Sequence, residues 1–165
     1  MRGVSVKSRV VLQLGSNMGN SKVKFVIAQR LIQERIGDIT LASSFYTSKA
    51  WGFEKQPDFL NQVIEVETRL KATTILERVL NIETEMGRVR NVLYGPRIID
   101  IDILFFNSEI IDESILTVPH PLLQHRRFVL APLVEILPKF IHPVLQKTLK
   151  ELLKTCDDNL NVQKI

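Results

Sequence analysis

The sequence predicts an α+β fold, in which an antiparallel sheet carries helices on one face. Two observations lead to it: some segments alternate apolar and polar residues as half-buried strands do, and others repeat apolar residues at helical spacing. In chain order these are strands at residues 9–14, 39–48, 59–68 and 98–106, and helices at 21–36 and 74–86. The order βαββαβ is that of the ferredoxin-like arrangement, which leaves the second sheet face free to build a site.

Local patterns define the first strand and the first helix. Val10, Leu12 and Leu14 alternate along the chain and therefore share one face of a strand. The helix over residues 21–36 is followed by Gly37, a residue common just after helix C-termini. Its buried stripe is expected to consist of Val23, Ile27, Leu31 and Ile32.

The next elements are two strands and a second helix. Residues 39–48 are rich in β-branched and aromatic side chains, and residues 59–68 alternate again. Thr74 and Glu77 have the spacing of a capping box, so the second helix is expected to start there and to end at Gly87. Its stripe is expected to comprise Ile75, Leu76, Val79, Leu80, Glu83 and Met86. For Glu83, the acidic member of that stripe, the simpler interpretation is a position at the solvated edge of the helix face.

The last third of the chain is predicted to be a hairpin followed by helices. The expected elements are a turn at 107–108, a short strand at 109–111, a rigid Pro-His-Pro turn at 119–121, and helices at 128–137 and 146–156. Thr148 and Glu151 have the spacing of a capping box in the last helix.

Composition predicts a single globular domain over residues 1–165. Hydrophobic residues make up 45% and charged residues 24%, and the net charge of +4 fits an anionic small ligand as well as nucleic acid. The only cysteine, Cys156, excludes an internal disulfide and suggests a cytoplasmic protein. We expect no membrane partner, because the sequence has neither the apolar core of a signal peptide nor a run of about 18 apolar residues.

Asp100 and Asp102 are the most informative residues for function. They lie in the apolar run 98–106, so their side chains point to the same face of a strand, with Cα atoms about 6.6 Å apart. Two carboxylates in such a strand are costly unless another charge offsets them. A bound cation would do so, and oxygen ligands favour Mg²⁺ over zinc. The alternative is that both carboxylates face solvent or pair with arginines.

Basic residues close to this pair suggest a phosphate-rich ligand. Arg88 and Arg97 precede the aspartates, and His120 and Arg126 follow them. Arginine binds phosphate oxygens bidentately and Mg²⁺ bridges them, a combination typical of phosphoryl transfer. A solvated loop is the alternative for the arginines, and a structural role is the alternative for His120. The segment 15–22 does not fit a P-loop, so a nucleotide would be held by metal and arginines.

Five short motifs add a family resemblance to this pattern. They are L-G-S-N at 14–17, Q-P-D-F-L-N at 56–61, G-R-V-R at 87–90, G-P-R-I-I-D-I-D-I-L at 95–104 and V-P-H-P at 118–121. Together they resemble the 6-hydroxymethyl-7,8-dihydropterin pyrophosphokinase family of folate biosynthesis, over about residues 9–143. The resemblance implies that the pterin's hydroxymethyl oxygen attacks the β-phosphorus of ATP and that AMP leaves.

The resemblance also implies site residues. Asp100 and Asp102 would hold two Mg²⁺ ions that bridge the phosphates of the co-substrate ATP, and one aspartate can assist deprotonation of the hydroxyl. Arg88 and Arg97 complete the implied catalytic set. The implied ATP-binding residues are Glu83, Arg88, Arg97, Ile103, His120 and Arg126. The implied pterin-binding residues are Ser48, Trp51, Phe59, Asn61, Asp100 and Phe128.

The loops at 49–58 and 88–97 match mobile lids of the family, which exclude water. The chain departs from the family pattern at four positions in the lids and at the pocket rim. Tyr94 stands where the family often has tryptophan, and Ala50 stands where it usually has proline. Phe59 stands where many members have tyrosine, and Trp51 stands where a small aliphatic residue is frequent. These changes concern the lids and the pocket rim, whereas the implied metal and phosphate residues are intact.

Two other functions compete with the kinase. A two-metal nucleotidyltransferase or nuclease also places Asp-x-Asp on a strand, but it needs a third carboxylate and a broad basic surface. A non-catalytic ferredoxin-like binding module does not explain two aspartates beside Arg97. We therefore expect small-molecule substrates and no nucleic acid. We also expect a monomer.

Overall fold

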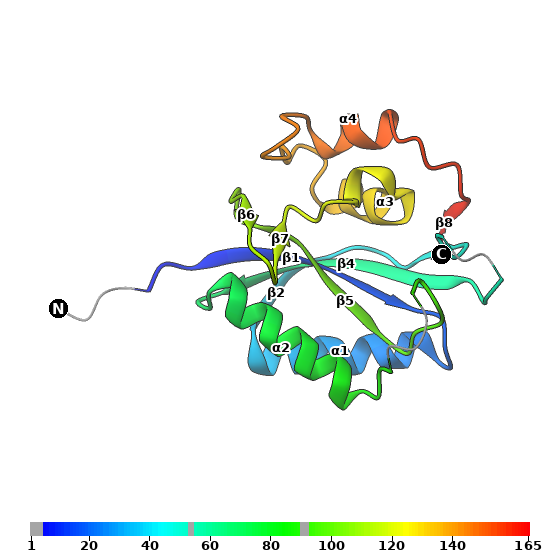
Figure 1. Cartoon of the computed structure of the whole chain (residues 1–165), viewed down its shortest axis with the longest axis horizontal. Helices are drawn as coiled ribbons and strands as arrows, with labels where there is room; N and C mark the ends of the chain where they lie inside the picture. Colours follow the sequence, from blue (N-terminus) through cyan, green and yellow to red (C-terminus); the bar gives the residue numbers. More distant parts are fainter. Residues whose placement is uncertain (1–4, 53–54, 90–92) are drawn as a thin grey trace.

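The computed structural model describes residues 5–52, 55–89 and 93–165 (Figure 1). Arg90, which belongs to one of the motifs, and parts of both predicted lid loops lie outside these ranges. The elements in chain order are β1 (Ser8–Ser16), α1 (Ser21–Arg35), β2 (Gly37–Ala42), β3 (Tyr46–Ser48), β4 (Phe59–Thr68), α2 (Ala72–Glu85), β5 (Asp100–Phe106), β6 (Ile111–Asp112), β7 (Thr117–Val118), the 3-10 turn η1 (Leu123–His125), α3 (Arg127–Ile136), α4 (Leu149–Lys154) and β8 (Val162–Lys164).

The main sheet confirms the predicted order of strands and helices. Its strands follow one another as β5, β1, β4, β3 and β8, β2 also pairs with β4, and the pairings are antiparallel. β1 lies between β5 and β4 and pairs with both. Gly15 lies opposite Asn61 on one side and Asp100 on the other, and Gln13 lies opposite Asp102. Since alternate residues of a strand share a face, these five side-chain positions lie on the same side of the sheet.

Helices α1 and α2 cover the other side of the sheet, as predicted (Figure 1). The core between them and the sheet contains fully buried side chains from both layers, including Leu12, Leu14, Ile32, Ile75 and Ile82. The alternating apolar residues of β1 therefore point into this core.

The second sheet face is not wholly free, contrary to the expectation. Helix α3 packs over it, and α4 packs against α3 (Figure 1). They bury a second apolar cluster that includes Val11, Val63, Phe105, Leu130 and Leu149. Removal of this apolar surface from water favours the packing. The end of the sheet that carries the two aspartates lines cavities, and the candidate site lies there.

Two predictions about helix faces are wrong in part. Leu31 and Ile32 of the predicted α1 stripe are buried, but Val23 and Ile27 are 50% and 38% exposed, and Phe25 and Ala28 are buried instead. Apolar side chains occur around the whole of this helix, so their spacing does not identify the buried face. In α2, Glu83 does not occupy a solvated edge, because it is only 2% exposed.

The strand predicted over residues 39–48 is divided into β2 and β3. Between them the Val63 backbone N–H donates to Ser43 Oγ at 3.0 Å, so a side chain replaces a backbone acceptor of the ladder. Gly37, predicted to cap α1, is instead the first residue of β2. A Cβ atom there would lie 2.0 Å from the carbonyl oxygen of Glu67, so this close approach of two backbones requires glycine.

Two helix starts also differ from the prediction. α2 begins at Ala72, ahead of the predicted capping box at Thr74. α4 has its predicted capping box, in which the Glu151 N–H donates to Thr148 Oγ1 at 3.2 Å and the Thr148 N–H donates to Glu151 Oε2 at 2.9 Å. The helix nevertheless starts at Leu149, because the capping residue itself precedes the first helical turn.

The C-terminal segment forms a strand that the sequence patterns do not reveal. β8 pairs with β3, and Glu135 on α3 ties the two strands to that helix. Its carboxylate accepts hydrogen bonds from Ser44 N and Oγ and from Tyr46 Oη, and lies 3.5 Å from Lys164 Nζ. Within the described ranges, no helix combines the length and the apolar character that crossing a membrane requires.

Glu135→Gln is expected to lower the melting temperature at pH 7 but much less at pH 3. Burial opposes ionisation of Glu135, but the hydrogen bonds from Tyr46 and Ser44 outweigh it and lower its pKa. The carboxylate therefore stabilises the fold above the unfolded pKa of about 4.3, and this contribution is lost as the pH falls through the lower folded pKa. Thermal melts of both proteins at the two pH values measure it, with Glu109→Gln as the exposed control. An equal difference at both pH values would contradict the prediction.

Candidate active site

Two cavities meet at the end of β5. The first, here called the aromatic cavity, is lined by residues that include Ser48, Trp51, Phe59, Asn61 and Phe128. The second, here called the arginine cavity, is lined by residues that include Glu83, Arg88, Ile103 and His120. Both are lined by Arg97, Asp100, Asp102 and Arg126. The structure therefore brings all the predicted site residues together and places the two aspartates where the cavities join.

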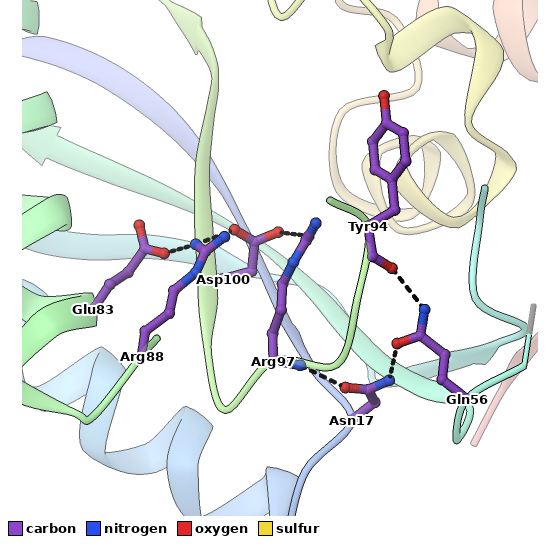
Figure 2. Close-up of polar contacts among 7 residues, drawn as sticks. All are labelled: Asn17, Gln56, Glu83, Arg88, Tyr94, Arg97 and Asp100. Carbon is purple, nitrogen blue, oxygen red and sulfur yellow. Dashed lines mark hydrogen bonds and ion pairs between the residues drawn. The ribbon is translucent and has the colours of Figure 1, made fainter. Parts of the chain in front are cut away.

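Asp100 is held between two arginines in an ion-pair network (Figure 2). Arg88 Nη1 donates to its Oδ1 and Arg97 Nη1 to its Oδ2, each at 2.6 Å. Arg88 also forms an ion pair with Glu83, whose carboxylate is buried beside it. Glu83 interrupts the apolar stripe of α2 because it faces this arginine. The sequence left open that the aspartates pair with arginines, and in the structure Asp100 does so.

Asp102 has a different environment although it is only two residues away. Its side chain accepts no hydrogen bond from the part of the chain that the structure describes. Burial and then the negative charge of Asp100 raise the pKa of Asp102 to about 7, although Arg126, Arg97 and Arg88 act in the opposite direction. A cation at this position would offset a carboxylate charge that the fold itself leaves poorly compensated.

The donor atoms of the pair suit a hard cation. Both are carboxylates, and no group of three or more His, Cys, Asp or Glu side chains in the described ranges could hold a metal ion. A pair of carboxylates is typical of Mg²⁺ sites that are completed by water and substrate phosphates, and it is unlike a structural zinc site. The residues present therefore fit Mg²⁺.

His120 and Arg126 supply hydrogen-bond donors to the arginine cavity. The Leu122 N–H donates to His120 Nδ1 at 3.2 Å, so the neutral ring carries its proton on Nε2. Burial and the nearby charge of Arg126 lower the pKa of His120 to about 4, which keeps the ring neutral at pH 7. Among the described residues, Nε of Arg126 has no hydrogen-bond partner, and neither has Nε of Arg88. Such donors can bind the oxygens of an anionic ligand.

The aromatic cavity combines flat apolar walls with one fixed polar edge. Phe59 and Phe128 line it from β4 and α3. Asn61 is 1% exposed, and its amide nitrogen donates to Ser48 Oγ at 2.8 Å. Its Oδ1 atom faces the space above Gly15, where an added Cβ atom would lie 3.8 Å from it. The cavity therefore offers an oriented acceptor beside aromatic rings, which suits a flat heterocycle that carries N–H donors.

The two predicted lid loops contact each other through residues that depart from the family pattern. The rings of Trp51 and Tyr94 pack edge to face with centroids 5.5 Å apart. Gln56 Nε2 donates to the Tyr94 carbonyl at 2.6 Å and its Oε1 accepts from Asn17 Nδ2, while Asn17 Oδ1 accepts from the Arg97 N–H (Figure 2). The unusual aromatic residues of the two loops thus form one contact.

Two residues that line the aromatic cavity escaped the sequence predictions, Gln13 and Lys49. Lys49 lies beside Asp58 at 3.1 Å at the exposed rim, and although it belongs to a predicted lid loop, it was not among the predicted site residues. Gln13 interrupts the apolar strand β1 as the aspartates interrupt β5, and that irregularity could have identified it.

Comparison with known proteins agrees with this geometry. A family model described as 7,8-dihydro-6-hydroxymethylpterin-pyrophosphokinase (HPPK) matches residues 11–138. A 2-amino-4-hydroxy-6-hydroxymethyldihydropteridine pyrophosphokinase of Aquifex aeolicus is 43% identical over 142 residues, which are 86% of this chain and 88% of the relative. A protein of the same name from Bacillus subtilis is 43% identical over 126 residues, covering 76% of this chain and 75% of the relative.

Some similar proteins are much longer than this chain. Folic acid synthesis protein fol1 of Schizosaccharomyces pombe is 36% identical over 151 residues, which are 90% of this chain but 21% of that protein. The crystal structure of wild-type Plasmodium falciparum HPPK-DHPS with pteroate matches with a TM-score of 0.73 and 19% identity, covering 90% of this chain and 42% of the solved one. At that identity the structural match supports the fold alone.

Proposed function

The chain belongs to the 7,8-dihydro-6-hydroxymethylpterin-pyrophosphokinase family of folate biosynthesis, and we propose that its two joined cavities bind the two substrates of this enzyme. The enzyme transfers pyrophosphate from ATP to the hydroxymethyl group of 6-hydroxymethyl-7,8-dihydropterin. The observation that carries the proposal is that an aromatic cavity and an arginine-lined cavity share Asp100 and Asp102. A transfer reaction needs such a junction, where the acceptor oxygen and the phosphorus atom meet.

The arginine cavity is the proposed ATP site. Arg88, Arg97 and Arg126 line it and can pair with triphosphate oxygens, and His120 offers its Nε2–H group as a neutral donor. Asp100 and Asp102 would hold two Mg²⁺ ions, which when bound neutralise charge on the phosphate oxygens. Because Asp100 already pairs with Arg88 and Arg97, we propose that these arginines exchange the carboxylate for phosphate oxygens when ATP binds.

The aromatic cavity is the proposed pterin site. Phe59 and Phe128 would stack on the ring, and the Oδ1 atom of Asn61 would accept a hydrogen bond from its edge, with Ser48 and Trp51 completing the walls. The ring's hydroxymethyl group would then extend toward the two aspartates, where a carboxylate can accept the hydroxyl proton. The contact between Trp51 and Tyr94 would close the loops over this cavity and exclude water, the competing acceptor.

The predictions about organisation follow from the same site. Its residues come from one chain and β8 joins the C-terminal segment to β3, so we propose that residues 1–165 act as one domain and as a monomer. We also propose a cytoplasmic enzyme with small-molecule substrates and no nucleic-acid partner.

Turnover with defined substrates tests the proposal. The protein is incubated with ATP, Mg²⁺ and 6-hydroxymethyl-7,8-dihydropterin, and AMP is measured. We expect AMP only when all three are present, and loss of AMP when Mg²⁺ is removed with a chelator. AMP formed without the pterin, or a rate unaffected by the chelator, would contradict the assigned roles.

Phe128→Ala is expected to weaken pterin binding about tenfold while leaving ATP affinity unchanged, because ring stacking contributes about 0.5–1.5 kcal/mol beyond area burial. Titration calorimetry with each ligand measures this. Phe45→Ala is the control: this partly buried phenylalanine packs against the α1 and α2 core, and its loss should affect stability only. Unchanged pterin affinity in the Phe128 variant would argue against stacking.

A further inference from the structure

Gln13 is a buried polar side chain in a wall of the aromatic cavity. It is 4% exposed and lies in the middle of β1, between Leu12 and Leu14, which point into the α1 and α2 core. Strand alternation therefore directs Gln13 to the opposite face, which carries the cavity. Neither the proposed ATP site nor the proposed pterin site uses this residue, and its neighbours in the strand do not require a polar side chain.

The side-chain amide of Gln13 has no hydrogen-bond partner among residues 5–52, 55–89 and 93–165. The residue is 4% exposed and its amide reaches only the cavity, so an apolar residue of similar size would avoid the cost of placing a polar group there without a protein partner. A nearby glutamine shows the usual solution: Gln62 on β4 is also buried, and its amide donates to the Ser43 carbonyl at 2.8 Å and accepts from Gln29. The amide of Gln13 is thus available to a molecule in the cavity.

The position of Gln13 in the sheet indicates which part of a ligand it can reach. Gln13 lies directly opposite Asp102 on β5. Asn61, which forms the polar edge of the cavity, lies opposite Gly15, two residues further along β1, and Asp100 lies opposite Gly15 on the other side. Directly opposite residues in an antiparallel pair have Cβ atoms about 4.5–5.5 Å apart. Gln13 therefore adjoins the aspartates at the junction of the cavities.

We propose that Gln13 is a positioning residue whose side-chain amide hydrogen-bonds the hydroxymethyl group of the pterin. This inference rests on the proposed pterin site. An amide and a hydroxyl group can each donate and accept, so one hydrogen bond fixes the rotation of the hydroxymethyl group about its bond to the ring. Such orientation brings the acceptor oxygen to the side of the cavity where Asp102 lies and where the phosphates would approach.

Binding of two pterins that differ by one hydroxyl group tests the proposal. Titration calorimetry, with Mg²⁺ and a non-hydrolysable ATP analogue present, compares 6-hydroxymethylpterin with 6-methylpterin. In Gln13→Leu we expect affinity for 6-hydroxymethylpterin to fall about tenfold, the upper range for one neutral hydrogen bond, and affinity for 6-methylpterin to stay the same. The melting temperature should be unchanged or higher, because the variant removes a buried amide without a protein partner.

Gln62→Leu is the matched control. It removes a glutamine amide that is bonded within the protein, so we expect a lower melting temperature and unchanged affinity for both pterins. The proposal is overturned if Gln13→Leu leaves both affinities unchanged, if it weakens both equally, or if the control shows the same selective loss. Failure of the wild-type protein to bind either pterin would instead overturn the proposed function, so the two failures are distinguishable.

Discussion

Asp102→Ala is expected to slow pyrophosphoryl transfer on the order of a thousandfold, because metal-assisted charge neutralisation contributes several kcal/mol to such reactions. The melting temperature at pH 8 should be unchanged or higher. Asp102 accepts no hydrogen bond from the described residues, and burial followed by the charge of Asp100 raises its pKa to about 7. An acid with a raised pKa holds its proton more tightly in the folded state, so above the unfolded pKa of about 3.9 its ionised form destabilises the fold.

Three measurements separate this role from a structural one. Turnover and thermal melts are compared at pH 8, and the dependence of ATP affinity on Mg²⁺ is titrated in the wild type and the variant. The variant should lose most of the Mg²⁺ dependence as well as activity. Asp112→Ala removes an exposed aspartate of β6 and should change none of the three. Activity and melting temperature that fall together would show that Asp102 is structural.

The parts of the fold that the sequence predicts are those set by short-range patterns. β4 has the predicted bounds, 59–68, because ten alternating residues specify a strand without reference to the rest of the molecule. The common face of Asp100 and Asp102 follows from the same geometry, since residues two apart on a strand point together. The family resemblance that the motifs carry then named site residues that line the two cavities.

The sequence fails where a residue's environment depends on a distant segment. The burial of Glu83 depends on its ion pair with Arg88, which in turn pairs with Asp100 on the separate strand β5. The strand β8 exists because β3 offers a free edge, and its three residues have no alternating pattern. The face of α1 was ambiguous because apolar residues surround the helix. In each case the deciding interaction is tertiary.

Arg88→Leu is expected to lower the free energy of unfolding by about 3–5 kcal/mol, the usual cost of removing one partner from a buried ion pair. The side chain of Arg88 is 8% exposed and pairs with Glu83 and Asp100, which are 3% and 14% exposed. The leucine variant leaves two neighbouring carboxylates without the cation that they share. Urea denaturation at pH 7 measures the change. Arg30→Leu, which removes an exposed arginine paired with Glu34 on α1, should cost no more than about 1 kcal/mol.

A double-mutant cycle tests whether this cost arises from the pair itself. The double variant Glu83→Leu, Arg88→Leu should lose less stability than the two single variants lose when their losses are added. In the double variant only Asp100 lacks a former partner, and Arg97 still contacts Asp100 at 2.6 Å. A coupling energy near zero would contradict the network. Glu83 would then have no electrostatic reason to be buried. If the coupling is large, Glu83 can hold Arg88 in place after Asp100 is released, so the arginine remains positioned for phosphate while the carboxylate becomes available to a metal ion.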